Sequence, residues 1–126
     1  MILSQKSRAR LTGLHPHLAD VVRRAAEITT LDFGVLEGVR SKARQAELVA
    51  AGASQTMNSR HLTGHAVDLG AYVAGSLRWD WPLYNKLNDV MQQAAKDQGI
   101  RIEWGGSWKR FPDGPHFQLP WETYPA

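Results

Sequence analysis

The sequence predicts a single domain of the α+β class, in which a small and mainly antiparallel sheet is flanked by about three helices. Three observations indicate this class. Two segments carry apolar residues at helical spacing and a third has helix start and stop signals, short strand-like runs lie between and after them, and clean strand–helix–strand units are few. With 126 residues, of which 43% are hydrophobic, the chain fits one compact domain that buries a core without disulfide bonds.

The first half of the chain contains two of the predicted helices and one strand. Apolar residues recur at helical spacing after Pro16, which predicts a helix over residues 16–29. Residues 32–38 alternate as a short strand does and end at a glycine. Ser41 is a suitable N-cap residue for a second helix, which we expect to stop near Gly52.

The second half contains the third helix and the remaining strands. Residues 53–64 are polar and aperiodic, so we expect a loop, and residues 66–73 then have the composition of a strand. Apolar residues at helical spacing predict a helix over about residues 82–99, which a glycine ends. Two short strand candidates, residues 100–104 and 116–119, flank a loop rich in glycine and proline.

Composition excludes several classes of protein. The chain has no cysteine, which removes disulfide frameworks, cysteine zinc sites and thiol nucleophiles, so any metal must bind His, Asp or Glu. The charged fraction of 21% and the net charge of +3 do not fit a disordered polyelectrolyte. We identify no signal peptide and no apolar run of membrane-spanning length, and therefore expect cytosolic synthesis and no stable membrane insertion.

Three side chains form a candidate metal site. A catalytic zinc ion takes three protein ligands from imidazole and carboxylate groups and keeps a fourth position open for water or substrate. His61, Asp68 and His116 supply that set, since a turn between the first two can bring a loop histidine and a strand carboxylate to one centre. Asp68 also lies within an apolar strand, where a buried carboxylate needs a cation or strong hydrogen bonds.

The other histidines are weaker candidates. His61 and His65 are four residues apart and could bind zinc from one face of a helix. Gly64 between them and the strand-like sequence that follows argue against a helix, so we expect His65 at a pocket rim or on the surface. His15 and His17 flank a proline at a helix entrance, where we expect an exposed or capping role.

Two charged residues are candidates for the chemistry itself. Asp113 precedes His116 by three residues, so a turn can bring its carboxylate beside the metal, where it would serve as general base; an ordinary Asp-Gly turn is the alternative. Arg40 follows the first predicted strand and can stabilise the oxyanion as an amide becomes tetrahedral. Its alternative is a salt bridge to Glu37 or Glu47.

These residues lie in two motifs that resemble a known family. SRHLTGHAVDL (Ser59–Leu69) fits the pattern S-x-H-x-x-G-x-A-x-D, and DGPHF (Asp113–Phe117) fits a later D/E-x-x-H. Together they resemble the zinc D-alanyl-D-alanine peptidase and L-alanyl-D-glutamate peptidase family, which includes vancomycin-resistance-type D,D-peptidases and single-domain phage endolysins. EGVRSKARQ (Glu37–Gln45) and EWGGSW (Glu103–Trp108) also look like family segments, so the similarity covers roughly residues 11–120.

The resemblance implies roles for particular residues. It implies His61, Asp68 and His116 as zinc ligands, Asp113 as acid/base, Arg40 as the arginine that holds a substrate carbonyl or carboxylate, and Ser59 as a substrate-side residue that supports the site. An aspartate at position 113 favours the endolysin branch. Gln118 stands where many relatives carry an acidic residue, which puts a supporting carboxylate there in doubt. Trp104, Trp108 and Phe111 are candidate pocket walls, with core packing as an equal alternative for Trp104.

We therefore predict a zinc peptidase of the phage-endolysin type, which cuts the L-alanyl–D-glutamate bond of peptidoglycan. We expect a monomer with a single catalytic domain, because the remaining length has no room for a separate wall-binding domain. By resemblance, it waits in the host cytoplasm and reaches the periplasmic wall through a phage holin. A D,D-carboxypeptidase or dipeptidase acting on D-Ala-D-Ala ends is the nearest alternative.

A non-catalytic basic module that binds cell wall or nucleic acid is the alternative of another class. Residues 1–63 carry nine Lys/Arg against five Asp/Glu, which could attract an anionic polymer, although an ordinary solvated face is the simpler interpretation. We expect peptidoglycan and not nucleic acid as the partner, because the two motifs predict a catalytic site.

Overall fold

The structure, a computed structural model, describes residues 1–54 and 56–125. It confirms the α+β class and the antiparallel sheet, with four α-helices among the described residues where about three were expected. The helices are α1 (Gln5–Arg10), α2 (Pro16–Ile28), α3 (Lys42–Ala50) and α4 (Trp81–Gln98), and the 3₁₀ turns are η1 (Arg60–Thr63) and η2 (Gly105–Ser107). The strands are β1 (Asp32–Glu37), β2 (Ala66–Val73), β3 (Ser76–Arg78), β4 (Glu103–Trp104) and β5 (His116–Gln118). Within the described ranges no helix is long and apolar enough to cross a lipid bilayer.

Some elements differ from the sequence-based expectation. Helix α1 was not expected because its 6 residues are too few to show a helical period; Ser4 caps it by accepting the Ser7 N–H at 3.0 Å. Strand β3 was also not expected, and the strand predicted over residues 100–104 is limited to the two residues of β4. Turn η1 lies within the predicted loop 53–64, of which Gln55 lies outside the described residues.

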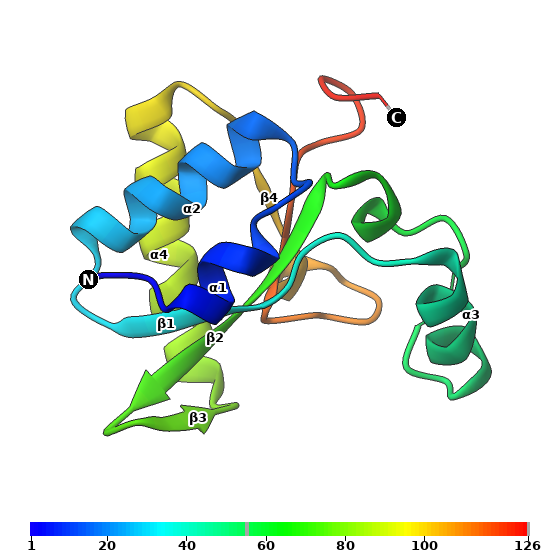
Figure 1. Ribbon diagram of the computed structural model, residues 1–126, viewed down its shortest axis with the longest axis horizontal. Helices are drawn as coiled ribbons and strands as arrows, with labels where there is room; N and C mark the ends of the chain where they lie inside the picture. Colours follow the sequence, from blue (N-terminus) through cyan, green and yellow to red (C-terminus); the bar gives the residue numbers. More distant parts are fainter. Residues whose placement is uncertain (55, 126) are drawn as a thin grey trace.

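Strand β2 is the centre of the sheet. The strand order is β1-β2-β5-β4, with β3 paired to the far end of β2, and every pairing is antiparallel. Helices α2 and α4 lie against each other on one side of β2, and α3 lies on the other side in the view of Figure 1. This arrangement leaves one face of the sheet covered by helices and the other open towards α3.

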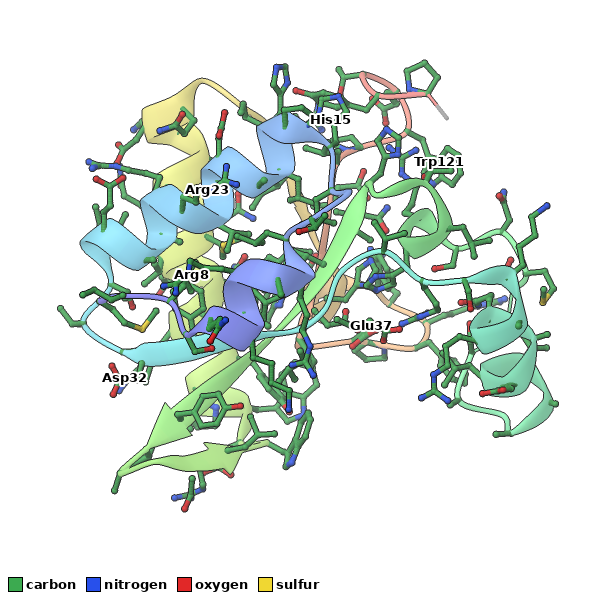
Figure 2. The ribbon with its side chains drawn as sticks, in the orientation of Figure 1. Arg8, His15, Arg23, Asp32, Glu37 and Trp121 are labelled. Carbon is green, nitrogen blue, oxygen red and sulfur yellow. The ribbon has the colours of Figure 1, made fainter. Side chains whose placement is uncertain are left out.

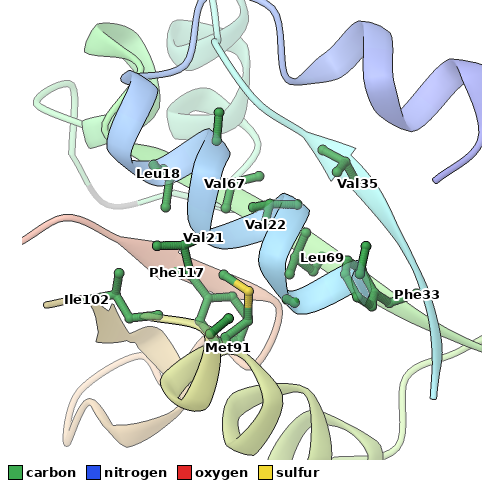
Figure 3. Close-up of a cluster of buried hydrophobic side chains, with 14 of the residues drawn as sticks. Leu18, Val21, Val22, Phe33, Val35, Val67, Leu69, Met91, Ile102 and Phe117 are labelled. Atoms are coloured by element: carbon green, nitrogen blue, oxygen red, sulfur yellow. The ribbon is translucent and has the colours of Figure 1, made fainter. Parts of the chain in front are cut away.

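The hydrophobic core lies between the sheet and the helices α2 and α4 (Figure 3). Leu18 and Val22 of α2, Met91 of α4 and Phe117 of β5 are fully buried there. Each large apolar side chain buried in this way contributes roughly 1.5–3 kcal/mol to the free energy of folding. The core therefore joins α2 and α4 to one face of the sheet, and the opposite face takes no part in it.

The two faces of β2 carry different side chains. Val67, Leu69 and Ala71 are completely buried in the core, so the two-residue period of a strand turns Asp68 to the opposite, open face. Glu37, at the end of β1, lies towards the same region between the sheet and α3 (Figure 2). The polar side chains that the sequence singled out are thus kept apart from the core.

Candidate metal centre and active-site cleft

Strand register brings acidic and imidazole side chains together on the open face of the sheet. Asp68 of β2 pairs with His116 of β5, and on its other side Asp68 pairs with Glu37 of β1. Directly opposed residues of an antiparallel pair carry their side chains on the same face. The pairing with Glu37 depends on a bulge between Val35 and Glu37, which adds one residue to β1 and re-aims the carboxylate.

His61 reaches this face from turn η1. Ser59 caps the turn, and its Oγ accepts the His61 N–H at 3.2 Å. The backbone N–H of Arg40 donates to the His61 carbonyl at 3.0 Å, and the imidazole Nδ1 lies 2.9 Å from the Gly38 carbonyl oxygen. The side chain is only 2% exposed, so both its backbone and its ring are fixed. Ser59 thus supports His61 directly.

The three predicted ligands converge on one point. His61 Nε2 lies 3.2 Å from Asp68 Oδ1, and His116 Nδ1 lies 3.3 Å from the same oxygen. Tetrahedral zinc ligands at roughly 2.0–2.1 Å from the metal stand about 3.3–3.4 Å apart, so both distances fit a shared zinc ion. Among residues 1–54 and 56–125, this is the one group of three such side chains whose ligand atoms all lie within 4.8 Å of one another.

Hydrogen bonds on the outer side of each imidazole leave its lone pair facing the centre. His61 Nδ1 faces the Gly38 carbonyl, which can only accept, so Nε2 presents its lone pair to Asp68. His116 Nε2 lies 2.8 Å from Gln118 Oε1, which likewise leaves the lone pair on Nδ1, on the side of Asp68, when the ring is neutral. Three acceptors that point at one another repel unless a cation lies between them, and metal-bound histidines are oriented by such outer contacts.

Gln118 links the candidate metal centre to a carboxylate. Its Nε2 donates to Glu103 Oε2 at 3.2 Å, and this bond turns the amide oxygen towards His116. Glu103 of β4 lies directly opposite Gln118 in the strand register. A supporting carboxylate is therefore present, one residue further from the metal centre, and acts through the glutamine.

In the metal-free protein, protons supply the positive charge that this centre requires. Burial alone would lower the pKa of His116, but its contacts with Asp68 raise it above the ordinary value. Burial alone would raise the pKa of Asp68, but hydrogen bonds from His116 and His61 hold it well below its usual range. Asp68 is thus ionised, which is the state that a metal ligand requires, and a metal ion that bound here would displace a proton.

A cleft of about 470 Å³ runs past the metal ligands, and Asp113 borders it. Solvent reaches the Asp113 carboxylate, and within the described ranges no side chain donates a hydrogen bond to it. Partial burial raises its pKa, the charge of Asp68 raises it further, and His116, His61 and Arg40 oppose the change. A raised pKa makes a carboxylate a stronger proton acceptor, which suits a general base.

Arg40 also borders the cleft, with its guanidinium held by neighbours. Nε and Nη2 donate to the Glu37 carboxylate at 2.7 Å each, and Nη1 donates to Gln45 Oε1 at 2.8 Å. Nη2 also lies 3.7 Å from Asp68 Oδ2. The salt bridge to Glu37, the alternative given by the sequence, is present. These bonds to described residues use three of the five N–H groups, which leaves one on each terminal nitrogen for a substrate oxygen.

The three predicted aromatic wall residues occupy different positions. Trp108 lines the cleft, and its ring centroid lies 5.0 Å from that of His116. Phe111 is 57% exposed, has a left-handed backbone with φ of 52°, and borders an adjoining recess. Trp104 is not among the described residues that line the cleft; its Nε1 donates to the Gly114 carbonyl at 2.8 Å. Trp108 is therefore the best placed of the three to touch a substrate.

Two further residues of the site were not singled out from the sequence. Trp121, labelled in Figure 2, lines the cleft and is 42% exposed. Its ring lies over the Arg60 guanidinium, 4.1 Å from the ring centroid. Glu103 supports Gln118 as described above. The sequence signal for Trp121 was a tryptophan a few residues after the His116 motif. The role of Glu103 depends on its strand pairing with Gln118, which the sequence separation of the two residues does not reveal.

The remaining histidines lie outside the metal centre. His65 Nδ1 lies 2.7 Å from Thr63 Oγ1, and its ring packs 5.5 Å from that of His15. His15 is the N-cap residue of α2 and accepts the His17 N–H at 3.0 Å, which confirms the expected capping role. His65 is not part of the convergent group, in agreement with the expectation that it lies at a rim or on the surface.

Comparisons with known proteins show which family the chain belongs to. The family model described as phage L-alanyl-D-glutamate peptidase matches residues 1–119. The L-alanyl-D-glutamate peptidase of Escherichia phage T5 is 32% identical over 124 residues, which cover 95% of this chain and 90% of that protein. The crystal structure of the Serratia marcescens L-Ala D-Glu endopeptidase ChiX is 49% identical with a TM-score of 0.93, and the match covers 99% of this chain and 95% of that one. The vancomycin-resistance D,D-dipeptidase VanXYg shares the fold, with a TM-score of 0.56 and 21% identity over 84% of this chain and 50% of that one. This chain belongs to the phage L-alanyl-D-glutamate peptidase family.

Proposed function

We propose that this chain is a peptidoglycan endopeptidase that hydrolyses the L-alanyl–D-glutamate bond with one zinc ion held by His61, Asp68 and His116. The observation that carries the proposal is the convergence of two imidazole lone pairs and one carboxylate oxygen at zinc-like spacing beside Asp113. Membership in the family and the names of the relatives support the polymer and the bond.

In the proposed reaction, Asp113 moves the proton. A zinc ion at this centre supplies Lewis-acid chemistry, because it polarises the scissile carbonyl and lowers the pKa of a water molecule. The Asp113 carboxylate takes a proton from the attacking water and returns it to the nitrogen of the leaving D-glutamate residue. Since no described side chain donates a hydrogen bond to this carboxylate, it is available for both transfers.

Arg40 and Trp108 are proposed to position the substrate. Arg40 carries a permanent positive charge beside Asp68, and its two unused N–H groups can stabilise the oxygen that gains negative charge as the amide becomes tetrahedral. Its pairing with Glu37 holds the guanidinium still, so little conformational entropy is lost when the substrate binds. Trp108 offers a rigid apolar surface beside His116.

Product identification with an Asp113→Asn variant tests the function. Purified sacculi digested by the wild-type chain are expected to yield new amino termini on D-glutamate, detected by mass spectrometry, and the reaction is expected to stop with EDTA. Asp113→Asn is expected to keep its zinc and lose about 10²–10⁴-fold in turnover. Asp89→Asn, the same change on an exposed position of α4, is the matched control and should retain full activity.

Three results would contradict the proposal in different ways. Release of free D-alanine without new D-glutamate termini would assign the chain to the D,D-carboxypeptidases. Binding to sacculi without cleavage, unchanged by EDTA, would indicate a non-catalytic wall-binding module. Full turnover by Asp113→Asn would remove Asp113 from the mechanism.

We also infer that the chain acts as a monomer and reaches the periplasmic wall from the host cytoplasm after a phage holin opens the membrane. Its similarity to a phage peptidase supports this route. Expression in a Gram-negative host is expected to lyse cells only when a holin is supplied together with it, and sedimentation is expected to give the mass of one chain. Lysis without a holin would contradict the route.

A further inference from the structure

We propose that Trp104 is a positioning residue, whose indole holds the segment Pro112–His116 in the place where Asp113 and His116 can act. The inference rests on the proposed function, because it concerns the proton shuttle and one metal ligand. Trp104 was considered above as a pocket wall or as core packing. Its position behind the segment, and not in the cleft lining, gives it a different role.

The segment is attached at several points of its backbone. Trp104 Nε1 donates to the Gly114 carbonyl at 2.8 Å, and the Asp113 N–H donates to the Gly105 carbonyl at 2.9 Å. The His116 N–H donates back to the Asp113 carbonyl at 3.2 Å, which closes a turn. Of these bonds, the one from Trp104 is the only side-chain bond, and it holds the middle of the turn.

Close packing leaves the segment little freedom. A Cβ atom at Gly105 would lie 2.6 Å from the Asp113 carbonyl oxygen, and a Cβ atom at Gly114 would collide with the Tyr84 ring. The ring of Trp81 lies 5.4 Å from that of Tyr84 and 6.4 Å from that of Trp104, measured between centroids. The turn therefore has β4 and η2 on one side and the aromatic rings of α4 on the other. Gly105 and Gly114 are the residues at the two closest approaches.

The backbone matters here because the Asp113 side chain has no support of its own. No described residue donates a hydrogen bond to its carboxylate, so the turn alone decides where the carboxylate lies. The same turn delivers His116 Nδ1 to within 3.3 Å of Asp68 Oδ1. A displacement of about 1 Å at a reacting group can cost on the order of 10²-fold in rate. Loss of the bond from Trp104 is thus expected to act through both residues.

The test compares two indole-to-phenyl changes within the same aromatic layer. Trp104→Phe keeps an aromatic ring but removes the donor to Gly114. Trp81→Phe makes the same chemical change at a neighbouring ring that makes no hydrogen bond to the turn among the described residues, and serves as the matched control. Melting temperature and zinc content of each full-length, zinc-loaded variant show that it is folded and loaded.

Two readouts separate positioning from general destabilisation. In Trp104→Phe, amide hydrogen exchange over residues 112–117 is expected to be about tenfold faster, which corresponds to the loss of one hydrogen bond. Its kcat is expected to fall about ten- to hundredfold with KM unchanged, because the variant misplaces the groups that act in the transition state. Trp81→Phe is expected to leave both quantities at the wild-type values.

The possible outcomes are distinct. Equal losses in the two variants would show that ring packing and not the hydrogen bond is responsible, and would overturn the inference. Unchanged exchange in Trp104→Phe would overturn it as well, and so would faster exchange with full turnover. If Asp113→Asn keeps full turnover, the failure lies in the proposed function, whatever the exchange data show.

Discussion

Replacement of Gln118 by leucine tests how the protein prepares its metal centre. Gln118 is buried, 6% exposed, and connects the His116 imidazole at 2.8 Å with the Glu103 carboxylate at 3.2 Å. Leucine has nearly the same volume, so the packing of β5 is expected to survive. The change removes the acceptor that directs the His116 proton to Nε2, and with it the bias that leaves Nδ1 free for a metal ion.

The structure allows the magnitude to be bounded. Loss of such an outer partner of a metal-bound histidine typically weakens metal binding about 10–100-fold. That range corresponds to about 1.4–2.7 kcal/mol of binding free energy. The buried Nε2–H of His116 is also left without a partner, which costs about 1–3 kcal/mol of folding stability and lowers Tm. The expected variant is folded, less stable, and weaker in its affinity for zinc.

The assay is a competition for zinc against a chromophoric chelator at fixed pH, and it extends to a double-mutant cycle with Glu103→Ala. Glu103 contacts the centre only through the Gln118 amide among the described residues. Glu103→Ala alone is therefore expected to weaken zinc binding up to about tenfold, the lower part of the range for outer partners. In the Gln118→Leu background the same change is expected to add nothing.

Two results would refute this reasoning. Wild-type zinc affinity in Gln118→Leu would show that the His116 tautomer is not set by this hydrogen bond. An effect of Glu103→Ala that is the same in both backgrounds would show that the carboxylate acts through space on the metal and not through the glutamine. Zinc affinity, and not activity, decides both cases.

Three further predictions concern the periphery of the site and the metal itself. His65→Ala is expected to bind zinc as the wild type does, and loss of zinc on metal analysis would restore the alternative in which His61 and His65 are paired ligands. Burial, then the charges of Arg60 and His15, lower the pKa of His65, so the unfolded state binds more protons below about pH 6.5 and stability is lost as the pH falls. The Tm of the wild type should accordingly fall more steeply than that of His65→Gln between about pH 7.5 and pH 5.5, and parallel curves would contradict this. Chelation is expected to lower Tm but to leave the far-ultraviolet circular dichroism spectrum unchanged.

The sequence was sufficient to predict helices α2 and α4 from their hydrophobic period and α3 from its N-cap residue, and to single out the three side chains of the candidate metal centre. Helices α2 and α4 bury a full apolar stripe, so the spacing of their apolar residues reports their structure directly. Asp68 could be recognised because a charged residue within an apolar strand requires a partner. His61 and His116 followed from their spacing to acidic residues in two short motifs. In each case the signal is local to a few neighbouring residues.

What could not be predicted depends on strand register and on turns. The bulge that brings Glu37 beside Asp68 adds one residue to β1, and nothing in the sequence of β1 reveals where it occurs. The pairing of Glu103 with Gln118 joins residues on two strands whose register is set by the whole sheet. Trp104 shows the same limit, because its aromatic side chain suits a pocket wall while its hydrogen bond to Gly114 places it behind the turn that carries Asp113.

The separation of core and site explains why a metal ion can be essential for activity without being essential for the fold. The ligands come from β2, β5 and η1, all on the open face of the sheet, whereas the buried cluster of α2, α4 and the strands contains none of them. A zinc ion bound there would tie η1 to the sheet, and it would stabilise the folded state by about 4 kcal/mol at a concentration a thousandfold above Kd. Small zinc domains unfold without metal because they lack a core of their own. Here the apolar face of the sheet already holds the chain together, so His61, Asp68 and His116 can be kept close together in the folded state before a metal ion binds between them.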